Sequence, residues 1–119
     1  MEKESRSYII KQYSKFSEYF KLPESIEELY LYDNKITEIK NLPPYLKILS
    51  LSSNKITEIQ NLPPNLKTLI LMYNYINEIK NLPNSLEELY LNNTDINKIQ
   101  NLPQPCIRLR VGVHKITEI

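Results

Sequence analysis

The sequence predicts a solenoid of the α/β repeat class, mostly β, with a concave parallel sheet and an extended, helix-poor convex side. Two observations predict it: a repeat of constant length and a fixed pattern of apolar residues within each repeat. The dipeptide Leu-Pro begins at positions 22, 42, 62, 82 and 102, so every interval is 20 residues. A constant interval of this size indicates stacked units that bury their apolar faces against one another.

Each unit carries the same inward-facing frame. In the second unit the frame consists of Leu46, Leu49, Leu51, Asn54, Ile56 and Ile59. Alternating leucines predict a short strand, because successive side chains point to opposite faces of a sheet. The Asn is suited to turn the chain and to bond backbone groups that the turn leaves unpaired. Strands are therefore expected near residues 29–31, 49–51, 69–71, 89–91 and 109–111.

The last two units depart from this frame at four places, one of which is Val111 in a Leu position. Thr94 stands in the Asn position of the fourth unit, and the fifth has Cys106 in a Leu position and His114 in the Asn position. We interpret Cys106 as a small buried apolar residue and His114 as a turn residue. The proline of each return fixes an extended chain and removes a backbone donor.

With these departures, five in-frame copies of L-x-x-L-x-L-x-x-N-x-I cover residues 22–119 and resemble the leucine-rich repeat. The 20-residue length and the L-P-P-x-L opening resemble the short bacterial-effector class. The Asn-Lys-Ile-Thr-Glu-Ile-x-Asn-Leu stretches at Asn34 and Asn54 are similar to repeats of phosphatase regulators, whose units are usually longer. The resemblance implies protein binding through the concave face. Some bacterial members add a ubiquitin-ligase domain after the repeats, for which we expect no room before Ile119.

The composition adds a second resemblance. The chain has 16 Ile, 13 Asn, 12 Lys and 9 Tyr, which AT-rich codons encode, and it has no Ala. The unit and this composition together are similar to uncharacterised leucine-rich repeat proteins of giant viruses. Codon bias is therefore an alternative explanation for the tyrosines.

Residues 1–21 are expected to form an atypical capping segment that covers the first full coil. One alternative is a degenerate coil, in which Ile9 takes the position of Leu29 but Lys11 falls on the inward position of Leu31. The other is a short helix, because Ile9, Tyr13, Phe16 and Phe20 have amphipathic spacing. We favour the coil, because Lys15-Phe16-Ser17-Glu18-Tyr19 aligns with the stretch Lys35-Ile36-Thr37-Glu38-Ile39 that lies 20 residues later.

Charge and hydropathy exclude several classes of partner. The chain has 15 basic and 14 acidic residues, without the basic excess expected of a nucleic-acid binder. It contains no apolar run near the roughly 20 residues of a membrane span, and no secretory signal is recognisable. A single Cys fits a reducing compartment. We therefore expect an intracellular, cytoplasmic protein, in the host cytoplasm if the source is viral.

The sequence offers little for catalysis. Gly112 is the only glycine, so there is no phosphate-binding loop, and no metal-binding motif is present. A Cys106–His114 nucleophile pair can be imagined, but both positions belong to the structural frame and no third orienting group is evident. We predict a non-enzymatic protein without a cofactor.

The outward positions of the strands and their exits vary between units and form the candidate binding face. The third unit places Ile70, Met72, Tyr73 and Tyr75 together, where solubility would favour polar residues. The predicted partner-binding residues are Tyr30, Tyr32, Ile48, Ile70, Met72, Tyr73, Tyr75 and Tyr90. The predicted function is a protein–protein interaction module with an unidentified protein partner. The alternative is a structural or decoy array without a specific ligand.

Most charges are expected to be structural. Glu27 can pair with Lys47, and Lys67 with Glu87, across adjacent strands. A broken acidic row on the convex side is expected to be solvated; it consists of Glu38, Glu58, Glu78 and Glu118.

Strand 109–111 is expected to be an open sheet edge flanked by Arg108 and Arg110. The arginines would keep this edge soluble. The alternative is that a partner or a second copy of the chain docks there.

Overall fold

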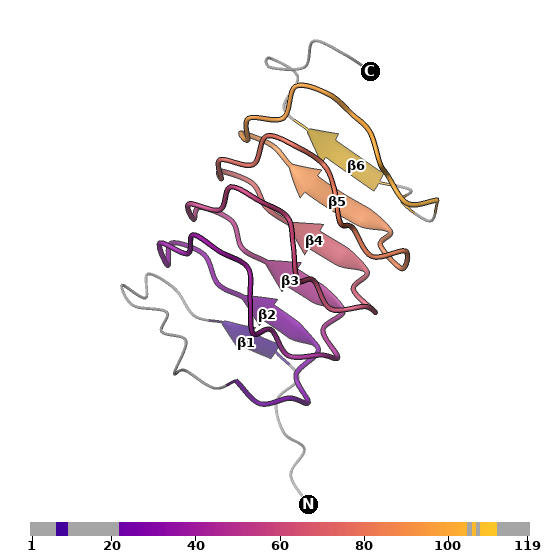
Figure 1. Cartoon of the computed structure of the whole chain (residues 1–119). Coiled ribbons are helices and arrows are strands. Elements are labelled where there is room, and N and C mark those ends of the chain that lie inside the picture. The colour runs from indigo at the N-terminus through magenta and orange to yellow at the C-terminus, as the bar shows by residue number, and fades with distance from the viewer. Residues whose placement is uncertain (1–6, 10–21, 105, 107, 112–119) are drawn as a thin grey trace, which may run out of the picture.

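A computed structural model describes residues 7–9, 22–104, 106 and 108–111. Within these residues, six strands form one parallel sheet in sequence order. They are β1 (Ser7–Ile9), β2 (Glu28–Tyr30), β3 (Ile48–Ser50), β4 (Thr68–Ile70), β5 (Glu88–Leu91) and β6 (Arg108–Val111). Figure 1 shows the strands stacked along one side, and β2 to β5 are each followed by an extended return on the other side. The prediction of a mostly β solenoid with a parallel sheet is confirmed.

The strands lie where the repeat predicts them, with one difference in their bounds. Each predicted strand was centred on the residue between two leucines, whereas β2, β3 and β4 are centred on Leu29, Leu49 and Leu69. These central leucines pair with one another in register across the sheet. The second leucine of each pair still bonds to the neighbouring coil, as when Leu51 N donates to Ile70 O at 2.8 Å.

The first strand corrects the register expected for residues 1–21. Tyr8, not Ile9, pairs with Leu29, so the first interval is 21 residues. Lys11, which was expected on the inward position of Leu31, lies outside the described residues. Residues 10–21, including Tyr13, Phe16 and Phe20, lie outside the described residues. The choice between a coil and a helix for that segment stays a prediction.

The returns are extended, and the described part of the chain contains no helix. Each described return ends in a β-turn that begins at proline. Leu86 N donates to Pro83 O at 3.1 Å, and Cys106 N donates to Pro103 O at 3.0 Å. Proline therefore does more than extend the return: its carbonyl starts the turn that brings the next inward residue into the core.

The core is a single column of aliphatic side chains inside the coils. Every fully buried apolar residue of the described part is a Leu or an Ile. The inward frame predicted from the repeat is confirmed, including Leu69, which is 0% exposed at the middle of the stack. Four frame residues near the C-terminal end are only half-buried: Ile99, Cys106, Leu109 and Val111. The Leu of each Leu-Pro pair from position 42 to 82 packs against this core from the side.

Buried asparagines link each coil to the one before it. Asn54 Oδ1 accepts from the backbone N–H groups of Asn34 and Ile36 at 2.9 and 3.0 Å. Its amide nitrogen donates to Leu31 O and Leu51 O, both at 2.8 Å. Asn74 repeats the arrangement with the second coil, through Ile56 N–H and Leu51 O. The predicted turn role of this Asn is confirmed, and its bonds also cross between coils.

Thr94 supplies fewer of these bonds in the fourth coil. Its hydroxyl donates to Leu91 O at 2.7 Å. A hydroxyl has one donor hydrogen, whereas an amide has two, so Thr94 cannot also donate to a carbonyl of the preceding coil.

A second series of asparagines, which the sequence analysis missed, lies in the returns. Asn61, Asn81 and Asn101 donate from their side chains to the carbonyls of Ile39, Ile59 and Ile79, at 3.0 to 3.1 Å. Their backbones are left-handed, with φ between 54° and 57°. Asn is one of the few residues other than Gly that adopts this conformation readily. Part of the high Asn content is therefore structural and not codon bias.

Truncation of the central core residue is expected to be costly. Leu69→Ala should lower the free energy of unfolding by about 2–5 kcal/mol, because it removes a fully buried side chain and leaves a cavity. Lys67→Ala should change it by no more than about 0.5 kcal/mol, since the lysine is half exposed and its ion pair is weak. Urea unfolding of both variants tests this, and equal losses would mean that the inward frame is misassigned.

Loss of one inter-coil asparagine should also be costly. Asn54→Ala leaves the buried N–H groups of Asn34 and Ile36 without their acceptor, and we expect a loss of at least about 2 kcal/mol. Asn65→Ala is the control, because Asn65 is exposed, and it should cost no more than about 0.5 kcal/mol. If the two variants unfold at the same urea concentration, the buried amide contributes no more than a surface one.

Candidate protein-binding face

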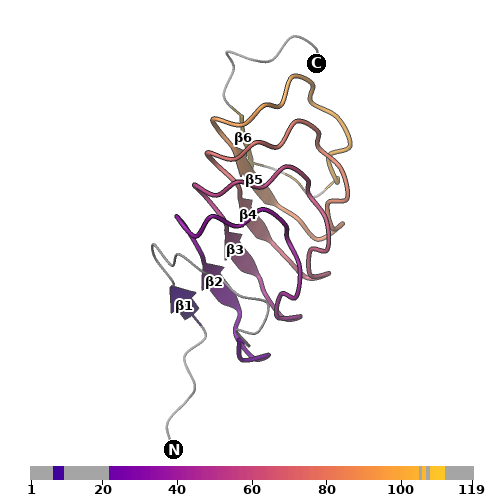
Figure 2. The same cartoon turned by 60° about the vertical axis from the view of Figure 1, so that its left-hand side comes forward.

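The outer side of strands β2 to β5 forms one continuous surface, which we call the sheet face. Its residues are Glu28, Tyr30, Ile48, Ser50, Thr68, Ile70, Glu88 and Tyr90. Side chains alternate along each strand, so these residues point away from the core leucines. All are half-buried except Ser50, which is buried. In Figure 2 the strands form one side of the molecule and the returns the other, which leaves the outer side of the strands clear of other chain segments.

The structure separates the predicted binding residues into two groups. Tyr30, Ile48, Ile70 and Tyr90 lie on the sheet face, and Tyr32 and Met72 lie two residues after the ends of β2 and β4. All six are half-buried. Tyr73 and Tyr75 are different, because they are 56% and 57% exposed. The predicted cluster of the third coil therefore consists of two exposed tyrosines beside half-buried Ile70 and Met72.

Tyr73 has an unusual backbone for its residue type. Its φ is 59°, in the left-handed region. The equivalent residues of the other coils, Asp33, Ser53 and Asn93, have the same conformation. Asn and Asp tolerate it, whereas a bulky side chain is disfavoured there by about 1 kcal/mol. The third coil thus carries a large exposed ring at a position where small polar residues would be more stable.

The backbone around the two tyrosines is bonded to both neighbouring coils. Tyr73 N donates to Asn92 O of the next coil at 3.0 Å. Tyr75 N donates to Ile56 O of the preceding coil at 2.8 Å. Because these bonds hold the main chain on both sides, the two rings project from a fixed backbone.

Two Tyr–Glu hydrogen bonds lie on the first and the last strand of the sheet face. The Tyr30 hydroxyl donates to Glu28 Oε1, and the Tyr90 hydroxyl donates to Glu88 Oε2, both at 2.9 Å. Partial burial, together with the acceptor Glu28, raises the pKa of Tyr30, so its hydroxyl stays protonated and able to donate. The sequence analysis missed these pairs, although Glu-Leu-Tyr at 28–30 and at 88–90 was a visible signal.

The structure also exposes a tyrosine that the sequence analysis did not single out. Tyr45 is 60% exposed. It borders a hollow of about 540 Å³ before the N-terminal ends of β2 and β3. The lining also includes Glu27 and Lys47, which form an ion pair at 3.7 Å.

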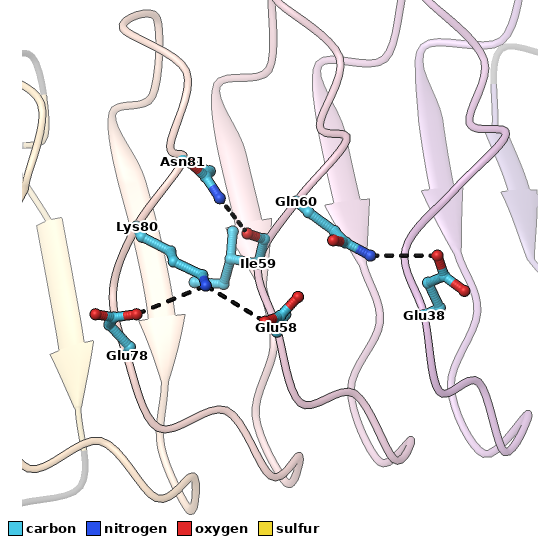
Figure 3. A network of polar contacts seen from close by, with 7 residues as sticks. All are labelled: Glu38, Glu58, Ile59, Gln60, Glu78, Lys80 and Asn81. Carbon is cyan, nitrogen blue, oxygen red and sulfur yellow. Dashed lines mark hydrogen bonds and ion pairs between the residues drawn. The ribbon is translucent and has the colours of Figure 1, made fainter.

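The predicted charge pairs are present, and the convex acidic row is more ordered than expected. Lys67 pairs with Glu87 at 3.4 Å, as Lys47 does with Glu27. Figure 3 shows Lys80 between Glu58 and Glu78, at 3.4 and 3.6 Å, and Gln60 beside Glu38. Glu38, Glu58 and Glu78 are exposed, in agreement with the expected solvated face, and they also pair with lysines and a glutamine amide. Glu118 lies outside the described residues.

Of the two residues considered for catalysis, only Cys106 lies in the described part. Cys106 packs against the core but is only half-buried, so its interpretation as a small buried apolar residue is confirmed only in part. Burial raises the pKa of its thiol, which disfavours the nucleophilic thiolate. His114 lies outside the described residues.

Two searches of the described residues gave negative results. No three His, Cys, Asp or Glu side chains of this part come together as a potential metal site. Within the same segments, no helix is long and apolar enough to cross a membrane.

Comparison with known proteins agrees with this geometry. Residues 24–64 match the family described as leucine-rich repeats (2 copies), and residues 54–94 match the FNIP repeat. The chain is a leucine-rich repeat protein. Among the solved structures that match it is the leucine-rich repeat domain of a Shigella effector, with a TM-score of 0.79 and 31% identity. No curated protein matches.

The structural match confirms the resemblance to the short bacterial-effector class. It covers 90% of this leucine-rich repeat protein and 49% of the Shigella chain. The protein therefore spans about half the length of the chain that it matches. Its likeness to giant-virus proteins stays a prediction.

Replacement of Tyr73 should stabilise this leucine-rich repeat protein. Tyr73→Asn should raise the free energy of unfolding by about 0.5–1 kcal/mol, because Asn fits the left-handed backbone with less strain. Tyr75→Asn is the matched control, since Tyr75 is equally exposed but is not among the residues with positive φ. The control should change stability by no more than about 0.5 kcal/mol. A Tyr73 variant that unfolds earlier than wild type would contradict the assignment of strain.

Proposed function

We propose that this leucine-rich repeat protein is a non-enzymatic module that binds another protein through the sheet face and the adjoining exit of the third coil. The observation that carries the proposal is Tyr73, a large exposed residue in a backbone conformation that disfavours it. Strain of this kind is typical of functional sites, where a binding contribution offsets a loss of stability.

The chemistry of the third coil supports a protein partner. Tyr73 and Tyr75 each present an apolar ring with a hydroxyl at its tip, and tyrosine is enriched among residues that dominate binding energy. Met72 and Ile70 beside them are half-buried and add apolar surface. Met72 is flexible and can adapt to the shape of a partner. Because the backbone is bonded to both neighbouring coils, little main-chain entropy would be lost on binding.

Family comparison supports the same class of function. Leucine-rich repeats generally mediate protein–protein interaction, and the Shigella match is an effector domain of this kind. An intracellular site of action fits the single cysteine.

The second candidate is a structural or decoy array without a specific ligand. It explains the tyrosines by codon bias. The return-segment asparagines show that a residue type enriched by codon bias can also have a structural role in this chain. A structural or decoy array gives no reason for Tyr to stand where Asp33, Ser53 and Asn93 do in the other coils.

The test is to capture partners from a lysate with wild type and with a Met72/Tyr73/Tyr75 triple-Ala variant, and then to measure binding isotherms of single variants. Tyr73→Ala and Tyr75→Ala should each weaken binding about thirtyfold, which corresponds to about 2 kcal/mol. Glu58→Ala on the convex side should bind as wild type does. If both tyrosine variants bind as tightly as wild type, the third coil is not the binding surface and the structural array becomes the better description.

A further inference from the structure

The two Tyr–Glu pairs of the sheet face are built alike but differ in what lies next to them. In each pair the Glu is the first residue of its strand and the Tyr is the third. The hydroxyl-to-carboxylate distance is 2.9 Å in both. They therefore present the same donor and acceptor geometry on two strands of one sheet.

The pair on β5 already holds a guanidinium. Arg108 is the register partner of Glu88 on the adjacent strand. Its Nη1 lies 3.8 Å from Glu88 Oε1. Tyr90 and Glu88 both raise the pKa of Arg108. The molecule itself thus shows which group a Tyr–Glu pair of this geometry accepts.

The pair on β2 has an isoleucine in the equivalent place. Ile48 on β3 and Ser7 on β1 are the register partners of Glu28, so neither partner is a cation. Among the residues that the structure describes, no Lys or Arg forms an ion pair with Glu28. Glu28 Oε1 accepts from Tyr30, and within the described part of the chain the other carboxylate oxygen is left to accept from a donor of a partner.

We infer that the Glu28–Tyr30 pair is a subsite for an arginine of the partner protein, carried on an extended segment that crosses the sheet face toward β4. This inference rests on the proposed function and specifies the partner's chemistry. Arginine fits better than lysine, because its planar guanidinium offers several donors at once to a carboxylate.

The spacing of the sheet predicts a second feature of the segment. Neighbouring strands are about 4.8 Å apart, and residues i and i+2 of an extended chain lie about 6.8 Å apart on the same side. A side chain two positions from the arginine would therefore lie over β3 and β4. Ile48 and Ile70 occupy that part of the face, so the residue there should be apolar. The expected motif is Arg-x-apolar, read in either chain direction.

The probe is a library of random peptides displayed on phage and selected against the whole chain. Kd values of the enriched peptides are then measured at low and high salt. Peptides with the Arg-x-apolar motif should be enriched. Glu28→Gln should weaken their binding about tenfold or more, and high salt should weaken it as well. Glu58→Gln is the matched control, because it neutralises a half-exposed carboxylate on the convex side.

A charge exchange separates recognition from a folding defect. Glu28→Gln keeps an oxygen that accepts from the Tyr30 hydroxyl, so its thermal unfolding midpoint should equal that of wild type. Glu28→Lys should lose the arginine peptides and bind the same peptides with Arg replaced by Glu. Rescue by the exchanged pair would support direct contact between the two side chains.

The outcomes distinguish this inference from the proposed function. Enriched peptides that lack arginine, lose affinity in Tyr73→Ala and are indifferent to Glu28→Gln would overturn the arginine subsite and leave the binding face intact. Peptides that are insensitive to every sheet-face and third-coil variant, or no enrichment at all, would overturn both.

Discussion

The structure depends on how each turn satisfies its backbone polar groups. Residues at the end of each strand leave the sheet and enter the interior, where unpaired N–H and C=O groups are costly. Asn54 and Asn74 pair these groups from the next coil. The side-chain oxygen of each accepts from a backbone N–H group of the preceding coil, and the side-chain nitrogen donates to a backbone carbonyl of that coil. A coil is therefore incomplete without its successor. This is why the units stack in one register and why their strands form a single parallel sheet.

That dependence divides the positions of each coil into two kinds. In the described part, inward positions are mostly Leu, Ile or Asn, with Thr94, Cys106 and Val111 in the last two coils, because these residues fill the core or bond a turn. Outward positions carry no such demand and can change without loss of the fold. Residues that contact a partner can therefore vary only at outward positions. The third coil has a bulky residue at such a position, because Tyr73 occupies a left-handed backbone.

The sheet face also shows how a repeat protein forms specific sites from repeated parts. Glu-Leu-Tyr occurs in two coils and produces the same hydrogen bond in both. The difference arises from the neighbouring strand, which presents Arg108 beside one pair and Ile48 beside the other. Similar local sequences therefore give different surfaces, because parallel stacking brings residues 20 positions apart into contact.

The sequence by itself determined the coil length, the inward frame, the location of five strands and the turn role of Asn54. These features repeat with a constant period and each follows from side-chain alternation and burial within one unit. The tertiary structure alone decided the register of β1 against Leu29, the left-handed backbone of Tyr73, the return-segment Asn series and the position of Lys80 between Glu58 and Glu78. Each of these depends on which groups of the adjacent coil lie within bonding distance. That information is not local to any one repeat, because it arises only when neighbouring coils stack.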